Sequence, residues 1–200
     1  MGKTRGFTLV ELAIVLVIIG IILGAILKGQ ELINNAKVKR LQNDLRGLEA
    51  AIWTFYDRYG RFPGDCNNNG TIEYQLPQTV TGPTLSLSTN TPNGICTGTE
   101  DQDQPFNDLK YARILPQNAA NADIAKHPFN GIFAIGYNGT AGYNAIAIYN
   151  VPTWAAKMID RSIDGSENGT NGRIRRWDSA GDWPSDQDQA VAIIYYFDRS

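Results

Sequence analysis

The stretch GFTLVE, residues 6–11, opens an apolar run that continues to residue 27. Residues 7–27 carry one charge, on Glu11. A helix rises about 1.5 Å per residue, so a helix of this length covers about 30 Å, the thickness of the hydrocarbon core of a bilayer. Lys3 and Arg5 precede the run, which predicts a cytoplasmic N-terminus and an exported C-terminal part. The run therefore predicts a single membrane-spanning helix.

Glu11 has no place in a plain membrane anchor. A carboxylate inside a transmembrane helix costs a few kcal/mol on insertion scales, roughly 2.5–3.5 kcal/mol for an acidic residue at the helix centre. We therefore interpret Glu11 as a functional residue that awaits a cationic partner. A secretory signal peptide would have a shorter apolar core and a small-residue cleavage site after it, and the sequence has neither.

A short basic leader that ends in Gly6, followed by FTLVE and an apolar helix, resembles the signal of type IV pilins and type II secretion pseudopilins. The resemblance implies that a prepilin peptidase cleaves between Gly6 and Phe7 and that Phe7 is then N-methylated. It also implies that Glu11 pairs with the N-terminal amine of a neighbouring subunit in a growing filament. A buried carboxylate is tolerated when a cation meets it in this way.

The apolar run continues into an amphipathic segment. One stripe of apolar residues, spaced three and four apart, runs along it: Val38, Leu41, Leu45, Leu48, Ile52, Phe55 and Tyr59. No proline interrupts residues 7–61, so we predict one helix over residues 7–59. Gly60 and Pro63 are placed to end it. The predicted organisation is a leader (1–6), a transmembrane or filament-core helix (7–27), its amphipathic continuation (28–60) and a globular head (61–200).

Two cysteines, Cys66 and Cys96, lie on the exported side. An even pair in an oxidising compartment favours a disulfide over a metal or redox site. The bond would hold a long loop, residues 65–105, whose composition is rich in Asn, Thr, Gly, Pro and Ser.

The loop begins with a spacing that matches the first eight positions of a calcium-binding loop, with Gly70 at the sharp turn. The candidate calcium ligands are Asp65, Asn67, Asn69, Thr71 and Glu73. The match fails at the twelfth position, where Leu76 replaces the bidentate carboxylate. Glu73, or a carboxylate from Glu100, Asp101 or Asp103, would have to take its place. An Asn-rich turn that binds no metal is the alternative, and the sequence leaves both open.

The sequence of the rest of the head predicts short helices and strands. We expect short helices at residues 108–115 and 152–161, a hairpin of residues 131–137 and 143–149, and a buried last strand at residues 190–197. The predicted fold class is α+β: a long N-terminal helix packed on a small antiparallel sheet, as the resemblance to type IV pilins also implies.

The composition favours a structural role. One histidine, two paired cysteines and no nucleophile or phosphate-binding motif give no basis for an enzyme. With 18 basic and 20 acidic residues the chain is weakly acidic, and its densest basic run, residues 173–176, is more typical of a solvated face than of a nucleic-acid site. We expect no nucleic-acid partner and no required cofactor, with calcium as the alternative.

The resemblance implies a subunit of a type IV pilus-type filament. Its partners would be other pilins, the prepilin peptidase, an inner-membrane assembly platform and, before assembly, membrane lipid. The protein would lie in a bacterial inner membrane with its head outside the cytoplasm and then in the filament. The alternatives are a type II secretion pseudopilin and a membrane-tethered binding module that never polymerises.

Overall fold

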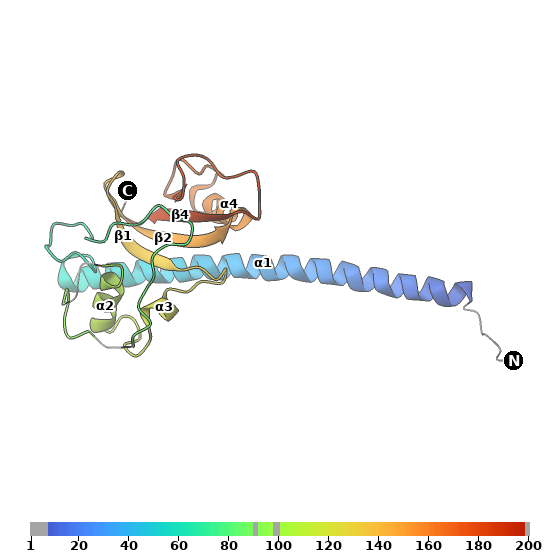
Figure 1. The fold of residues 1–200 in the computed structure, drawn as a ribbon, viewed down its shortest axis with the longest axis horizontal. Helices are drawn as coiled ribbons and strands as arrows, with labels where there is room; N and C mark the ends of the chain where they lie inside the picture. The colour runs from blue at the N-terminus through green and yellow to red at the C-terminus, as the bar shows by residue number, and fades with distance from the viewer. Residues whose placement is uncertain (1–7, 90–91, 98–100, 199–200) are drawn as a thin grey trace. The chain divides into compact units, whose positions relative to one another are not determined.

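The computed structural model describes residues 8–89, 92–97 and 101–198. Within these residues, four helices and four strands follow one another (Figure 1): α1 (Leu9–Tyr59), α2 (Gln104–Tyr111), α3 (Asn121–Ile124), β1 (Phe133–Asn138), β2 (Tyr143–Pro152), α4 (Thr153–Asp164), β3 (Ile174–Arg176) and β4 (Ala190–Tyr196). The strands form one sheet in the order β1-β2-β4-β3, and all neighbours are antiparallel. The predicted α+β class, a long N-terminal helix and a small antiparallel sheet, is confirmed.

Contacts divide the chain into two compact units, Met1–Lys39 and Arg40–Ser200. The described part of the first unit is helical, because α1 begins at Leu9 and continues without a break into the second unit. Its large apolar side chains over residues 9–27 are 46–86% exposed, and they surround the helix on every side. An apolar helix with no polar face must be covered by lipid or by other apolar helices.

In the second unit, the last part of α1 packs against the sheet through the stripe that the sequence predicts. Leu41, Leu45, Ile52 and Phe55 are almost completely buried. Each such side chain contributes about 1.5–3 kcal/mol when it leaves water. Tyr59 is the exception at the end of the predicted stripe, since it is 41% exposed.

The two faces of the sheet carry side chains of different size. On β2, Ile146 and Ile148 alternate with Ala145 and Ala147, and all four are fully buried. The face that carries Ala145 and Ala147 packs with Leu76, Tyr149 and Trp177. From β4 it includes Ala192, Ile194 and Tyr196. Trp177 Nε1 and the Tyr149 hydroxyl both donate to the Pro77 carbonyl, at 2.7 and 3.0 Å. The long loop is thereby fixed over this face.

Several elements differ from the prediction. Helix α2 begins four residues before the predicted 108–115 segment and ends at Tyr111, because Pro105 starts it and Arg113 turns the chain with a positive φ of 58°. Strand β3 and the single turn of α3 were not expected. Helix α4 extends the predicted 152–161 helix to Asp164, where Gly165 in a left-handed conformation ends it.

Figure 1 shows the sheet and α4 on one side of the last part of α1, and α2 and α3 on the other. Two hydrogen bonds from α1 stabilise this arrangement. The Gln42 side chain donates to the Ser162 hydroxyl of α4, and the Arg58 guanidinium donates to the Ala112 carbonyl after α2. The head therefore holds the end of α1 from two directions.

Candidate functional site

Thr8 and Glu11 form a reciprocal hydrogen-bonded pair at the start of α1. The Thr8 amide and hydroxyl both donate to Glu11 Oε2, at 2.8 and 2.9 Å. The Glu11 amide donates back to Thr8 Oγ1 at 3.3 Å. This is a capping box, in which the residue before the helix and the third helical residue satisfy each other's free amides.

The capping box gives Glu11 a defined position in the single subunit. Its carboxylate lies on the first turn, where the positive end of the helix dipole favours negative charge. The described hydrogen bonds all reach Oε2 and leave Oε1 available for a further donor. The predicted processing residues, Gly6 and Phe7, lie outside the residues that the structure describes.

The surface that follows Glu11 is apolar and uncovered. A shallow depression between Leu9, Val10, Ala13, Ile14, Val17 and Ile18 is lined almost wholly by apolar atoms. Within the described residues, α1 is the helix that is long and apolar enough to cross a membrane. Glu11 is therefore a single carboxylate at the edge of a surface that suits lipid or another apolar helix.

The predicted disulfide between Cys66 and Cys96 is confirmed. It lies beside Asp108 of α2, a buried carboxylate that the sequence analysis did not single out. Asp108 accepts the amides of Gly64 and Cys96, at 2.8 and 2.9 Å, and the Gln104 side chain at 2.7 Å. Burial raises the pKa of Asp108, and these donors oppose that effect. One side chain thus connects the segment that follows α1, the disulfide and α2.

The structure brings the five candidate calcium ligands into one tight turn. Asp65 accepts the amides of Asn69 and Gly70, at 3.1 and 3.0 Å, and Asn69 accepts the amide and hydroxyl of Thr71. Glu73 turns back to the amides of residues 66 and 67, at 2.7 and 3.2 Å.

Two features of this turn bear on the calcium prediction. Within the turn, Glu73 is the candidate to replace the missing twelfth ligand. Both of its carboxylate oxygens already accept hydrogen bonds from backbone amides. Within the described residues, no group of three or more His, Cys, Asp or Glu side chains is placed to hold a metal ion. The donor chemistry suits calcium, whereas the arrangement is that of a self-satisfied turn. Calcium at this loop stays a prediction.

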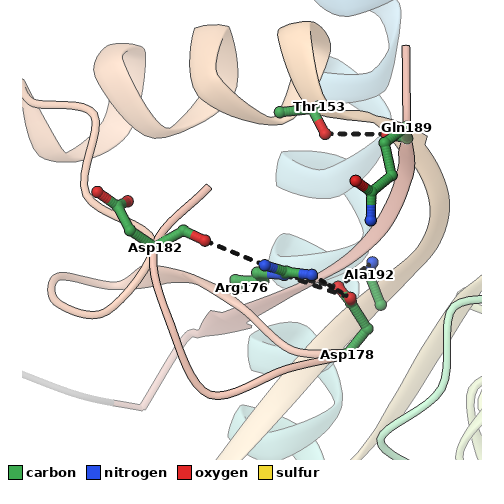
Figure 2. Close-up of polar contacts among 6 residues, drawn as sticks. All are labelled: Thr153, Arg176, Asp178, Asp182, Gln189 and Ala192. Atoms are coloured by element: carbon green, nitrogen blue, oxygen red, sulfur yellow. Dashed lines mark hydrogen bonds and ion pairs between the residues drawn. The ribbon is translucent and has the colours of Figure 1, made fainter. Parts of the chain in front are cut away.

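The arginines of residues 173–176 bind partners within the protein. Arg173 contacts Glu49 at 3.3 Å and the Tyr196 carbonyl at 3.2 Å, and the Arg175 guanidinium lies over the Tyr196 ring. Figure 2 shows the Arg176 guanidinium between the Asp178 carboxylate and the Asp182 carbonyl. These arginines therefore stabilise the C-terminal strands through ion pairs, hydrogen bonds and a cation–π contact within the protein.

The same view explains how the segment after β3 reaches β4. Asp178 pairs with Arg176 at 2.9 Å and accepts the Ala192 amide of β4 at 2.9 Å (Figure 2). The Thr153 hydroxyl donates to the Gln189 carbonyl at 2.9 Å, which joins the start of α4 to the start of β4. Both side chains of the Arg176–Asp178 pair are largely buried.

The sequence carried a signal for the Thr8–Glu11 pair, because Thr-x-x-Glu before an apolar run is the pattern of a capping box. Asp108 had no such signal, since its donors come from Gly64 and Cys96, far away in the sequence.

Comparison with known families matches residues 1–27 to the prokaryotic N-terminal methylation motif. No curated protein sequence matches the chain. Among solved structures, the major type IV pilin PilA1 from Clostridium difficile is similar over 82% of this chain and 96% of its own, with 12% identity and a TM-score of 0.42. At its N-terminus, residues 1–27, this chain therefore carries the methylation motif of prokaryotic prepilins, as its first residues indicated.

Proposed function

We propose that the protein is a subunit of a type IV pilus-type filament that polymerises through its N-terminal helix. In this proposal the prepilin peptidase cleaves between Gly6 and Phe7, and Phe7 is N-methylated. Glu11 then receives the amine of Phe7 from a neighbouring subunit. Before assembly the helix lies in the inner membrane with the head outside the cytoplasm, and an assembly platform in that membrane extracts it.

The observation that carries the proposal is the combination of an uncovered apolar helix with one placed carboxylate. The helix is apolar on all sides over residues 9–27, so neighbouring copies can replace lipid around it. Glu11 keeps Oε1 available while Thr8 holds Oε2. A buried amine would complete the carboxylate's bonding, since desolvated charges need a partner.

The first test is the intact mass and N-terminal sequence of protein from its native host. A mature chain that starts at N-methylated Phe7 supports the pathway. A chain that still begins at Met1 or Gly2 would overturn it and would make the protein a simple anchored domain.

The second test separates assembly from membrane insertion. We expect Glu11→Ala to abolish filament formation while the protein still reaches the membrane. Glu31→Ala is the matched control, because Glu31 is also an exposed glutamate of α1 but lies beyond the apolar run and pairs with Lys28 at 2.7 Å. If Glu11→Ala assembles as well as the control, the non-polymerising tethered module is the better description.

A pseudopilin of a type II secretion system is the alternative within the same class of filament. The Cys66–Cys96 bond lies before the hairpin and so leaves the last strands unstapled, which is unlike many pilins. Secretion of folded proteins in a strain that lacks this subunit, compared with its surface piliation, distinguishes the two.

We propose that the subunit requires no cofactor and is not an enzyme. Calcium at the Asp65 turn is the alternative. We expect that calcium gives no more thermal stabilisation than magnesium, because the turn's amides already bind its oxygens. A calcium-specific rise in melting temperature that is lost in Asp65→Asn would establish the loop as a calcium site.

A further inference from the structure

Two carboxyl groups meet inside the C-terminal part of the head, at the end of α4. Asp160 and Asp164 are four residues apart and therefore lie on the same face of the helix. Asp160 is completely buried, although it is an aspartate. Its Oδ2 accepts the Trp183 indole N–H at 2.8 Å and the Asn168 amide at 2.7 Å. Its Oδ1 is also buried, and no donor group reaches it.

Each carboxylate oxygen of Asp164 accepts one backbone amide, which leaves a second lone pair on each. Its Oδ1 accepts the Arg173 amide at 3.1 Å, and its Oδ2 accepts the Ile174 amide at 2.8 Å. These bonds cover the outer edge of β3, which would otherwise present free amides to another chain. Burial, and with it the nearby Asp164 one turn further along α4, raises the pKa of the Asp160 carboxyl group. A hydrogen bond between the two groups needs a proton on one of them, because ionised carboxylates are acceptors only.

The charged groups around the pair are engaged elsewhere. On α4, Arg161 pairs with Glu167 at 2.8 Å. Arg173, just before β3, pairs with Glu49, and Arg176 of β3 pairs with Asp178.

The remaining groups that face the pair come from α4 and from the loop before β4. Lys157 of α4 acts on Asp182, and Asp182 itself accepts the amides of Gly169 and Trp183, at 2.8 and 2.7 Å. In the described part of the chain, no cation is therefore placed to neutralise Asp160.

We infer that Asp160 and Asp164 share one proton and that this carboxyl–carboxylate bond is a pH-sensitive latch. Protonated Asp160 donates from Oδ1 to Asp164, while its Oδ2 keeps the Trp183 and Asn168 donors. The closed latch holds the loop of residues 165–172 between α4 and β3. When the proton leaves, the buried charge of Asp160 and the partly buried charge of Asp164 repel each other, and the loop and the Trp183 segment loosen.

A shared proton fits better than a metal ion. The amides of Arg173 and Ile174 already point at the Asp164 oxygens, so partial positive charge occupies the places that a cation would take. A single proton needs no additional ligands, whereas calcium needs six to eight oxygens.

The direction of the pH effect follows from burial. Burial, together with the nearby Asp164, raises the pKa of Asp160 to about 6, against the donors Trp183 and Asn168. The folded state thus binds the proton more tightly than the unfolded chain, whose aspartate has a pKa of 3.8. The contribution of Asp160 to stability is full below pH 3.8 and is lost as the pH rises through about 6.

The experiment compares the full-length wild type with Asp160→Asn in detergent, by chemical denaturation from pH 4.5 to 8. Asparagine imitates the protonated acid, because its N–H₂ can donate to Asp164 while its oxygen accepts Trp183. We expect equal stability at the acid end. At pH 7.5 we expect the unfolding equilibrium constant of the variant to be about tenfold to a hundredfold lower than that of the wild type.

Asp182→Asn is the matched control. Asp182 lies in the loop before β4, next to Trp183, but backbone amides lower its pKa, so its substitution should not stabilise the protein at pH 7.5. Infrared spectroscopy gives a direct readout: a protonated buried carboxyl band should be present at pH 5 and absent in Asp160→Asn.

Three results would overturn the latch. The difference between wild type and Asp160→Asn could show no dependence on pH, or the variant could be less stable than the wild type at pH 7.5. Added calcium could instead stabilise the wild type at pH 7.5, with the effect lost in Asp160→Asn, which would identify a cation site in place of the shared proton.

Discussion

The Tyr195 hydroxyl donates a 2.9 Å hydrogen bond to the Glu49 carboxylate and thereby ties β4 to α1. Arg173 contacts the other oxygen of Glu49 at 3.3 Å, and its guanidinium lies 4.8 Å from the centre of the Tyr195 ring. Three elements distant in the sequence thus meet at one carboxylate. Glu49 is a polar residue next to the predicted apolar stripe of the helix, and the sheet uses it as an anchor.

We expect Tyr195→Phe to lower the free energy of unfolding by about 1–2 kcal/mol. Loss of the hydroxyl removes one hydrogen-bond donor from the partly buried Glu49 carboxylate. Equilibrium denaturation measures the change. Tyr56→Phe is the control on α1, since Tyr56 is 37% exposed, and it should change stability by less than about 0.5 kcal/mol. Equal effects of the two substitutions would show that the Glu49 contact contributes nothing.

His127 should remain neutral well into the acid range. Its side chain is buried, its Nε2 lies 2.7 Å from the Tyr149 carbonyl, and its Nδ1 accepts the Phe129 amide. Burial lowers the pKa of His127 from 6.5 to about 4, against the Tyr149 contact. The unfolded chain therefore binds the proton more readily, so stability is full above pH 6.5 and falls by about 2–3 kcal/mol as the pH drops towards 4.

The protein has one histidine, so NMR can follow its titration without ambiguity. We expect the imidazole to titrate near pH 4, with His127→Gln removing part of the loss of stability between pH 6.5 and 4. A midpoint near 6.5 would mean that the side chain is open to water. In the structure Gly131 packs directly against His127 and helps to exclude water from the imidazole. A Cβ atom at position 131 would lie 1.9 Å from the Tyr149 carbonyl oxygen and 2.5 Å from His127 Nε2.

Removal of the disulfide should destabilise the head by about 3–4 kcal/mol, the chain-entropy value for a loop of this size. The two cysteines are 30 positions apart, and none of the described helices and strands lies between them. Denaturation of the double variant Cys66→Ser/Cys96→Ser, beside wild type with and without reductant, measures the loss. A change below about 1 kcal/mol would mean that Asp108 and its donors hold the loop without the covalent bond.

The parts of the fold that could be predicted are those with a local cause. The spacing of Leu41 to Phe55 gives α1 its buried stripe, and eight consecutive apolar residues give β4. Strand β3 has only three residues, two of them arginines, and forms because β4 pairs with it. Asp108 and Asp160 are buried by contacts with distant segments, which the neighbouring residues do not reveal.

Thr8 should decide how Glu11 is presented before assembly. Thr8→Val keeps the shape of the side chain but removes the hydroxyl, and with it the bonds to Glu11 Oε2 and from the Glu11 amide. We expect faster hydrogen exchange at the first amides of α1 in detergent, because one amide loses its acceptor. Thr8→Ser retains the hydroxyl and should behave as wild type. If Glu11 must be held by Thr8 to meet a neighbour's amine, Thr8→Val will also assemble less filament than Thr8→Ser at equal subunit levels. Equal assembly with faster exchange would instead show that the cap stabilises the helix and that the neighbour's amine orients Glu11 unaided.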